Sequence, residues 1–215
     1  MTNRWIIIAA LLAAAGLAVL ATAGFAQFGG QAPNDGASGS GQVLIGGAGA
    51  PVAVTPSRLE KLLLQPGAVV TRGYTDIGAI QGDNGSELHV LAVEASASAG
   101  KQYGLALQIP GRAETLLDEE GIDPLLASLD ALGKFQRDTG TKLNNSEGRY
   151  RTPEGLEIVN ADSNGMRLAT VRIVQVIWPT GQVAEGSMMF RPQRFEEIGR
   201  LVKGAKERIA TAKSG

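Results

Sequence analysis

The chain is 215 residues long, with 20 basic and 21 acidic residues, 5% aromatic residues and no cysteine. This length is enough for one ordinary domain, while the lack of cysteine excludes disulfide bonds and lipid attachment through an N-terminal cysteine. The near-zero net charge gives no general attraction to nucleic acid or to an anionic membrane surface. The scarcity of aromatic rings disfavours surfaces that bind sugars or single-stranded nucleic acid by stacking.

The first 26 residues form an export signal. Arg4 and the amino terminus make a short positive end, and an uncharged apolar stretch follows from 5 to 26. Small residues at 21–26 provide the cleavage pattern of a signal peptide. The stretch is also long enough to span a bilayer, so two alternatives stay open: a cleaved signal, or an uncleaved anchor. In both, the domain is exported to the periplasm, the medium or the outer side of the membrane, and only residues 5–26 contact lipid.

A flexible linker is expected next, over residues 27–54, because this stretch is rich in Gly, Ala and Ser and has no sustained apolar period. The folded domain is expected over 55–215. It begins with a short helix, for which Thr55 is a candidate N-cap, and Ser57 and Glu60 have the spacing of a capping box.

The first half of the domain has strand signals followed by helix signals. Alternating and β-branched segments predict strands at 68–74, 76–81, 87–96, 101–109 and 114–118. Asn84-Gly85 is the strongest of the hairpin signals between them. The strand at 101–109 alternates apolar and polar residues, which is typical of an antiparallel sheet with one covered face. The helix that follows is expected to begin with Asp123 as N-cap and Pro124 in the first position.

The second half repeats this plan. Strands are predicted at 148–152, 155–161, 166–178 and 183–190. A turn is expected at 163–165, and Arg191-Pro192 begins a final helix with apolar residues at helical spacing. The sequence therefore predicts one α+β domain, in which a plan of antiparallel strands and one amphipathic helix (ββββα) is used twice.

His89 is the only histidine in the chain and lies in a predicted strand. Glu87 is two positions away on the same strand face and is able to orient the ring. A catalytic role also needs a nucleophile, and neither a cysteine nor a G-x-S-x-G motif is present. A zinc site would need further His, Cys or carboxylate ligands. We therefore favour a structural histidine at the edge of a packed surface over a catalytic one.

Four carboxylates cluster within six residues: Asp118, Glu119, Glu120 and Asp123. Carboxylates at such spacing are able to bind Ca²⁺ or to act as an acid and base pair. This is the basis of an alternative hypothesis, a carboxylate-based hydrolase or calcium-dependent enzyme. The cluster also precedes a predicted helix, where the helix dipole favours negative charge, and we prefer that explanation.

Arginines in the second half are candidates for binding a small anion. Arg149 and Arg151 share a strand face, and Arg167 lies on the long strand that follows. Guanidinium groups on a sheet suit phosphate or carboxylate ligands. The interpretation that we prefer is a solvated face balanced by nearby acidic residues: Glu154, Glu157 and Glu185. The glycine-rich segments lack a phosphate-loop pattern, and we expect neither a cofactor nor a metal ion.

Four motifs together resemble those of a family of exported bacterial proteins of unknown function: YTDIG at 74–78, IDPLLASLDAL at 122–132, RYRT at 149–152 and RFEEIGRLV at 194–202. The resemblance covers about residues 59–211. Its motifs are core and capping patterns and carry over no catalytic residue. The doubled plan of strands and helix is also similar, in topology alone, to the Whirly and PUR single-strand nucleic-acid binders. Charge, composition and export argue against nucleic acid as a partner.

The leading hypothesis from the sequence is a non-catalytic exported or membrane-tethered domain. Its partner is expected to be a protein or a cell-envelope component, bound through a sheet face or a sheet edge. The export signal, the linker and the lack of a catalytic set of residues support this hypothesis.

Overall fold

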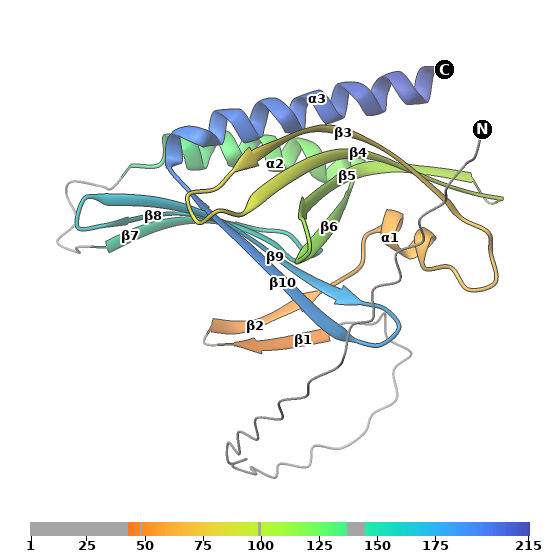
Figure 1. Ribbon diagram of the computed structural model, residues 1–215, viewed down its shortest axis with the longest axis horizontal. Helices are drawn as coiled ribbons and strands as arrows, with labels where there is room; N and C mark the ends of the chain where they lie inside the picture. The colour runs from red at the N-terminus through yellow and green to blue at the C-terminus, as the bar shows by residue number, and fades with distance from the viewer. Residues whose placement is uncertain (1–42, 48, 99, 137–144) are drawn as a thin grey trace, which may run out of the picture. The chain divides into compact units, whose positions relative to one another are not determined.

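The computed structural model describes residues 43–47, 49–98, 100–136 and 145–215. It contains two four-stranded antiparallel sheets, each followed in the chain by a helix (Figure 1). The α+β class and the doubled plan of strands and helix predicted from the sequence are confirmed.

The first sheet has the strand order β3-β4-β5-β6. Its strands are β3 (Thr71–Gln81), β4 (Glu87–Ala97), β5 (Gly100–Ile109) and β6 (Ala113–Asp118). The two strands expected at 68–74 and 76–81 are a single strand, in which the register shifts between Asp76 and Gly78. The hairpin at Asn84-Gly85 is confirmed: Gly85 takes a positive φ of 75° between β3 and β4.

The helix α2 (Glu119–Lys134) begins earlier than the sequence predicts. Asp118, not Asp123, is the N-cap residue, and Pro124 lies inside the helix. The helix starts directly where β6 ends, and Glu119 and Glu120 in its first turn are favoured by the helix dipole. Aspartate is a good N-cap residue at both positions. The helix begins at the first of them because β6 ends there.

The second sheet has the strand order β10-β9-β8-β7. Its strands are β7 (Asn145–Arg151), β8 (Leu156–Ser163), β9 (Met166–Ile177) and β10 (Gln182–Phe190). A two-residue turn joins β8 to β9, with φ of 52° at Asn164 and 84° at Gly165, as a tight hairpin requires. After β10 come one 3-10 turn, η1 (Pro192–Arg194), and the long helix α3 (Phe195–Ser214).

One hydrophobic core joins the two sheets to α2 and α3. Its largest fully buried side chains include Phe190, Leu105, Leu125 and Leu156, from β10, β5, α2 and β8. The helix α3 packs on β3, β4 and β5 and along α2, as Figure 1 shows. Both helices therefore bury one amphipathic face, as their apolar spacing predicts.

A short helix, α1 (Arg58–Leu63), covers the other face of the first sheet. Leu59 is fully buried there, in a second core cluster with residues of β4, β5 and β6: Leu91, Val93, Ala95, Ala106 and Leu116. Ser57 is the N-cap, since its Oγ accepts a hydrogen bond from the Glu60 N–H at 3.0 Å. Thr55 is not the cap; its backbone N–H donates to the Pro153 carbonyl oxygen at 2.8 Å.

Two strands lie within the stretch that the sequence predicts to be a flexible linker, 27–54. They are β1 (Val43–Gly47) and β2 (Gly49–Val54), and they pair antiparallel. The segments VLI and VAV favour strands, and the glycines between them allow the chain to turn. Val54 is buried against Val174 and Val176 of β9. The rest of the predicted linker, 27–42, lies outside the described residues.

Candidate functional site

A groove runs between α2 and α3, with a volume of about 720 Å³. Its apolar lining comes from Leu126 and Leu129 of α2 together with Pro192 and Phe195 at the start of α3. Gly133 and Gly199 have no side chain, and this keeps the groove open between the helices. Gln193 and six charged residues, four basic and two acidic, complete the lining: Lys134, Arg167, Arg200, Lys203, Asp130 and Glu196.

The charge of the groove is unbalanced. Lys134 pairs with Asp130 of its own helix, with Nζ 2.7 Å from Oδ2. Arg200 and Lys203 form no ion pair with any residue that the structure describes. Both are exposed side chains on one side of α3. The groove therefore presents an excess of positive charge above an apolar floor, which favours a ligand that is acidic and partly apolar.

Arg167 lies at the sheet end of this groove. Its Nη2 donates to the Phe135 carbonyl oxygen, at 2.5 Å, where α2 ends. Its Nε is buried and has no hydrogen-bond partner among the described residues. Arg167 thus lines this groove, whereas Arg149 and Arg151 do not.

Arg149 and Arg151 lie on the opposite face of the second sheet from Arg167, so the structure does not bring the three arginines together. Arg151 Nε is 2.7 Å from Glu157 Oε1, and Arg149 also donates to that oxygen. Arg172 contacts the other oxygen of Glu157 at 3.6 Å and Glu185 at 2.7 Å. Glu157 and Glu185 therefore balance the charge of the arginines on this face, as the interpretation preferred from the sequence requires.

Glu157 is the centre of this ion-pair cluster, with a side chain only 11% exposed. Burial alone raises the pKa of Glu157, but hydrogen bonds from Arg151 and Arg149 outweigh it and hold the pKa below its ordinary value. Arg149 and Arg151 are already bound to carboxylates. They therefore have fewer free N–H donors for an external anion than the basic residues of the groove have.

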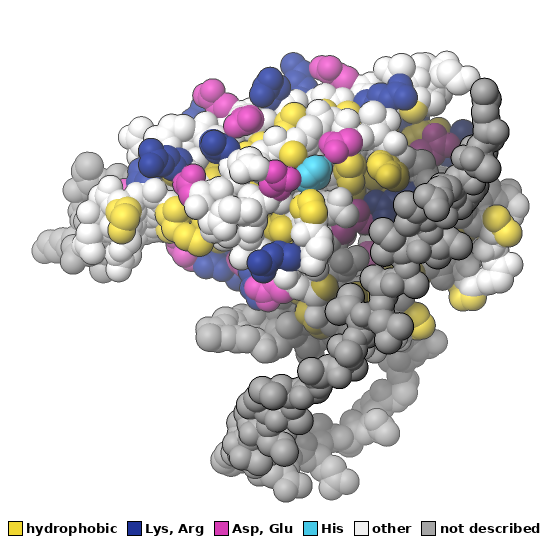
Figure 2. Space-filling model, in the orientation of Figure 1, with side chains coloured by type: hydrophobic (Ala, Val, Ile, Leu, Met, Phe, Trp, Pro, Cys, Tyr) yellow, Lys and Arg dark blue, Asp and Glu magenta, His cyan; other side chains and the backbone are white. Residues whose placement is uncertain are grey.

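His89 projects from β4 between two carboxylates. Its Nδ1 is 3.1 Å from Asp76 Oδ2 and its Nε2 is 3.3 Å from Glu87 Oε2. Figure 2 shows the histidine at the surface with acidic side chains beside it. The contact with Glu87 was predicted from strand alternation. The contact with Asp76 follows from the β3–β4 register, in which Asp76 is opposite Leu91, two residues from His89 on the same face.

Two effects set the pKa of His89. Partial burial lowers it, but the hydrogen bonds to Asp76 and Glu87 together outweigh burial, so the pKa lies above its ordinary value. The protonated ring is therefore stabilised by a carboxylate on each side. No Ser, Thr or Lys side chain in the described part of the chain is hydrogen-bonded to the ring, and the arrangement is that of a structural ion-pair triad.

Replacing His89 with Asn is expected to remove a stabilising contribution that exists only at low pH. Because the folded pKa is raised, this contribution is fully present below the unfolded pKa and is lost as pH rises through the folded pKa. Urea unfolding of both proteins at about pH 5.5 and about pH 8.5 measures it. The stability difference between them should be larger at the lower pH, and an equal difference at both would contradict this assignment.

The four acidic candidates near α2 all have partners, and two of them, Asp118 and Glu120, share Arg58. Asp118 accepts hydrogen bonds from the backbone N–H groups of Arg58 and Leu59, both at 2.9 Å, and so caps α1. Ion pairs occupy the others: Glu119 with Lys213 at 2.9 Å, Glu120 with Arg58, and Asp123 with Lys206.

These carboxylates therefore do not converge on a shared pocket. In the described part of the chain, no three His, Asp or Glu side chains are grouped so as to hold a metal ion. Glu119 and Glu120 lie in the first turn of α2, as the interpretation preferred from the sequence requires. Asp123, however, lies inside that helix, and the Asp118 carboxylate caps α1 and makes no capping hydrogen bond to α2.

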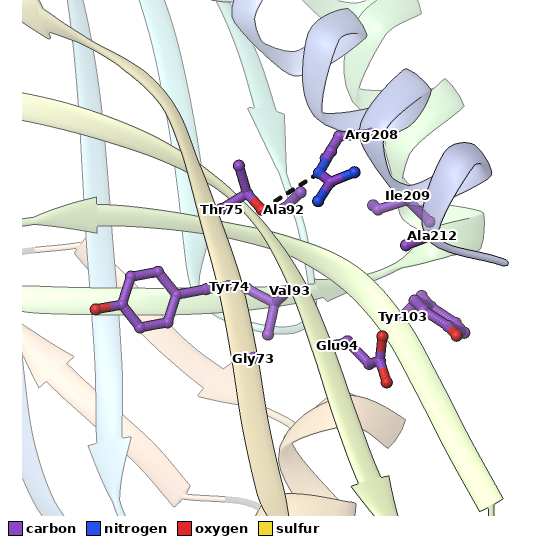
Figure 3. A pocket seen from close by; sticks show the side chains of 10 residues that line it. All are labelled: Gly73, Tyr74, Thr75, Ala92, Val93, Glu94, Tyr103, Arg208, Ile209 and Ala212. Atoms are coloured by element: carbon purple, nitrogen blue, oxygen red, sulfur yellow. Dashed lines mark hydrogen bonds between the residues drawn. The ribbon is translucent and has the colours of Figure 1, made fainter. Parts of the chain in front are cut away.

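A second, smaller hollow of about 240 Å³ lies between the end of α3 and the first sheet (Figure 3). Arg208 and Glu94 line it with Tyr103, and Arg208 Nε is 3.4 Å from Thr75 Oγ1. Glu94 already pairs with Lys101 at 2.8 Å. With one cation and one carboxylate in its lining, this hollow favours neither an anion nor a cation.

The groove between α2 and α3 was not anticipated from the sequence, although a signal for it exists. Glu196, Arg200 and Lys203 follow one another at i, i+4 and i+7, which places them on one side of a helix. Lys134 and Asp130 have the same relationship on α2. What the sequence does not contain is the pairing of these two helix sides across an open space.

Comparison with protein-family models gives no match for this chain, and no curated protein sequence matches it either. Within the described ranges, no helix combines the length and the apolar character needed to cross a membrane. The apolar stretch 5–26, predicted to be the export signal or anchor, lies outside them.

Proposed function

We propose that this chain is a non-catalytic, exported or membrane-tethered domain that binds an acidic segment of a partner protein in the groove between α2 and α3. The observation that carries the proposal is the groove itself, which combines an apolar floor with two basic side chains at its rim, Arg200 and Lys203, that form no ion pair with the described residues. Amphipathic peptides bind in grooves of this kind by burying apolar anchors while their charges meet the rim.

The apolar floor favours a peptide over other acidic components of the envelope. Leu129, Pro192 and Phe195 are buried beneath the groove, and the half-buried Leu126 offers an apolar contact that an anionic polysaccharide or a free phosphate has no apolar groups to use. A protein segment supplies both kinds of group. Arg200 and Lys203 are suited to its carboxylates, and Arg167 is suited to one that enters deeply.

The engagement of the candidate catalytic residues supports a non-catalytic role. His89 is held by two carboxylates, and Asp118 is held by backbone N–H groups of α1. A general acid or base must be free to reach a substrate proton. Neither residue lines the groove.

The proposal is tested with the full-length chain in mild detergent and two labelled helical peptides. One peptide carries Leu on one face and Glu on the other, and the second carries Lys in place of Glu. The wild-type chain should bind the acidic peptide, with an affinity that falls as salt is added, and not the basic one. In fluorescence anisotropy, Arg200→Glu/Lys203→Glu should weaken binding by about tenfold or more, because two attractive rim charges become repulsive.

Lys206→Glu/Lys213→Glu is the matched control. These two lysines lie on the same helix, are paired with Asp123 and Glu119 outside the groove, and change the net charge by the same amount. Their reversal should leave peptide affinity nearly unchanged. Equal weakening by both double variants would mean that general charge, not the groove, attracts the peptide. Displacement of the peptide by inorganic phosphate at constant ionic strength would favour a small-anion site instead.

A further inference from the structure

The edge of the first sheet is open along β3. Within the described part of the chain, β4 is the only strand that pairs with β3, so the other side of its backbone has no strand partner. Most residues of its first half are exposed, and the Tyr74 side chain stands out, with 68% of the residue exposed. In Figure 3, the Tyr74 ring projects from β3 away from Arg208 and α3. An exposed edge with an aromatic side chain is a template for another strand.

We propose that two copies of the chain pair antiparallel through β3, with Tyr74 of each copy at the twofold axis. The axis of such a pair is perpendicular to the sheet, so each residue stays on its own face. Because side chains alternate faces, only registers that are centred on a residue are allowed. Centring on Tyr74 places the two rings opposite each other, and cross-strand aromatic pairs of this kind stabilise sheets.

Charge complementarity selects this register. Arg72 and Asp76 lie two positions before and after Tyr74 on the same face, so pairing centred on Tyr74 sets each Arg72 opposite the other copy's Asp76. Their side chains are 33% and 48% exposed. Arg72 uses Nη2 for Glu114, which leaves four of its five N–H donors. Asp76 Oδ1 accepts from the Gly78 N–H and Oδ2 contacts His89, and each oxygen keeps a second lone pair for a partner.

The rest of the strand is compatible with this pairing. On the face that α3 covers, the opposed residues are Gly73 and Thr75, which are small. The regular segment extends from Thr71 to Asp76, where the register shift ends it. Edge strands that avoid pairing carry like charges or prolines, but here the charges are opposite and symmetric about Tyr74. The second sheet also has an edge strand, β7, but it begins next to residues that the structure does not describe, so we propose no pairing there.

Disulfide cross-linking of the full-length chain tests the pairing directly, because the chain contains no cysteine of its own. In Tyr74→Cys, the two Cβ atoms would lie about 5 Å apart across the axis, close to disulfide geometry. Mild oxidation in intact cells, followed by non-reducing electrophoresis, should give a covalent dimer. Val69→Cys is the control: Val69 is more exposed, at 92%, but its symmetry mate would lie about 30 Å away.

The Tyr74→Cys dimer should exceed the Val69→Cys dimer by about fivefold or more at equal oxidant. Equal yields would overturn the proposal, because chance collision would then explain both. In the Tyr74→Cys background, Arg72→Asp alone and Asp76→Arg alone should each lower the yield by about tenfold, and the double exchange should restore it. If both single variants cross-link as well as the parent, the proposed register is wrong. Circular dichroism melting confirms that each variant is folded.

Discussion

Gly155→Ala is expected to be the most destabilising of the substitutions considered, with a loss of about 3–5 kcal/mol. Gly155 has a φ of +90°, and a Cβ there would lie 2.0 Å from the Val174 carbonyl oxygen. That oxygen belongs to the backbone of β9, and the Val174 N–H is itself bonded to the Gly155 carbonyl at 2.9 Å. The turn at Gly155 and strand β9 are joined by this hydrogen bond, so neither can move away from the other without breaking it. Urea unfolding followed by Trp178 fluorescence measures the loss.

Gly181→Ala separates the two causes. Gly181 also has a positive φ, 69°, but no atom lies within 4 Å of the position that a Cβ would take. It should therefore cost only the backbone strain, about 1 kcal/mol. Equal losses in the two variants would show that β9 moves to admit the methyl group, contrary to the structure.

Asp118→Ala is expected to destabilise the protein by about 2–3 kcal/mol. Its carboxylate, 19% exposed, accepts two N–H groups at the start of α1, and nothing else in the described part of the chain takes its place. With those donors unsatisfied, α1 should detach from the first sheet and uncover Leu59. Faster amide exchange at Leu59 and Glu60 would report this detachment separately from global unfolding.

Glu119→Gln and Glu120→Gln are the matched controls. Both carboxylates belong to the same cluster but form exposed ion pairs, so their free energies of unfolding should stay close to that of the wild type. Asp118→Asn, which keeps one acceptor oxygen, should lie between the wild type and Asp118→Ala. If all three carboxylates were equally dispensable for stability, the capping role of Asp118 would be refuted.

Most strands and helices were predictable because their patterns are local. Alternation identified β5, a 3.6-residue period identified α3, and Asn-Gly identified the first hairpin turn. The errors occur where a non-local contact decides. The bulge at Ile77 joins two predicted strands, and the end of β6 sets the start of α2 in preference to Asp123.

The separation of Arg167 from Arg149 and Arg151 has a simple cause. Within one strand, residues with odd numbers lie on one face of the sheet and residues with even numbers on the other. The next strand keeps this assignment only if the turn between them has a suitable length. The two-residue turn at Asn164-Gly165 sets Asp162 opposite Arg167, so an even position faces the same way as an odd one. The β7–β8 connection preserves parity, with Arg149 opposite Val159. Predicting a site on several strands therefore requires the length of each connection, which the sequence suggests only where the turn is tight.

The cap on α1 also has a consequence for the order in which the protein folds. The helix has six residues, too few to be stable in isolation. Two N–H groups at its start are satisfied only by the carboxylate of Asp118, about 60 positions further along the chain. The ribosome releases α1 well before β6, yet α1 can be completed only after β6 has joined its sheet. We therefore expect α1, the first helix among the described residues, to form late, so its docking marks the completion of the first half of the fold.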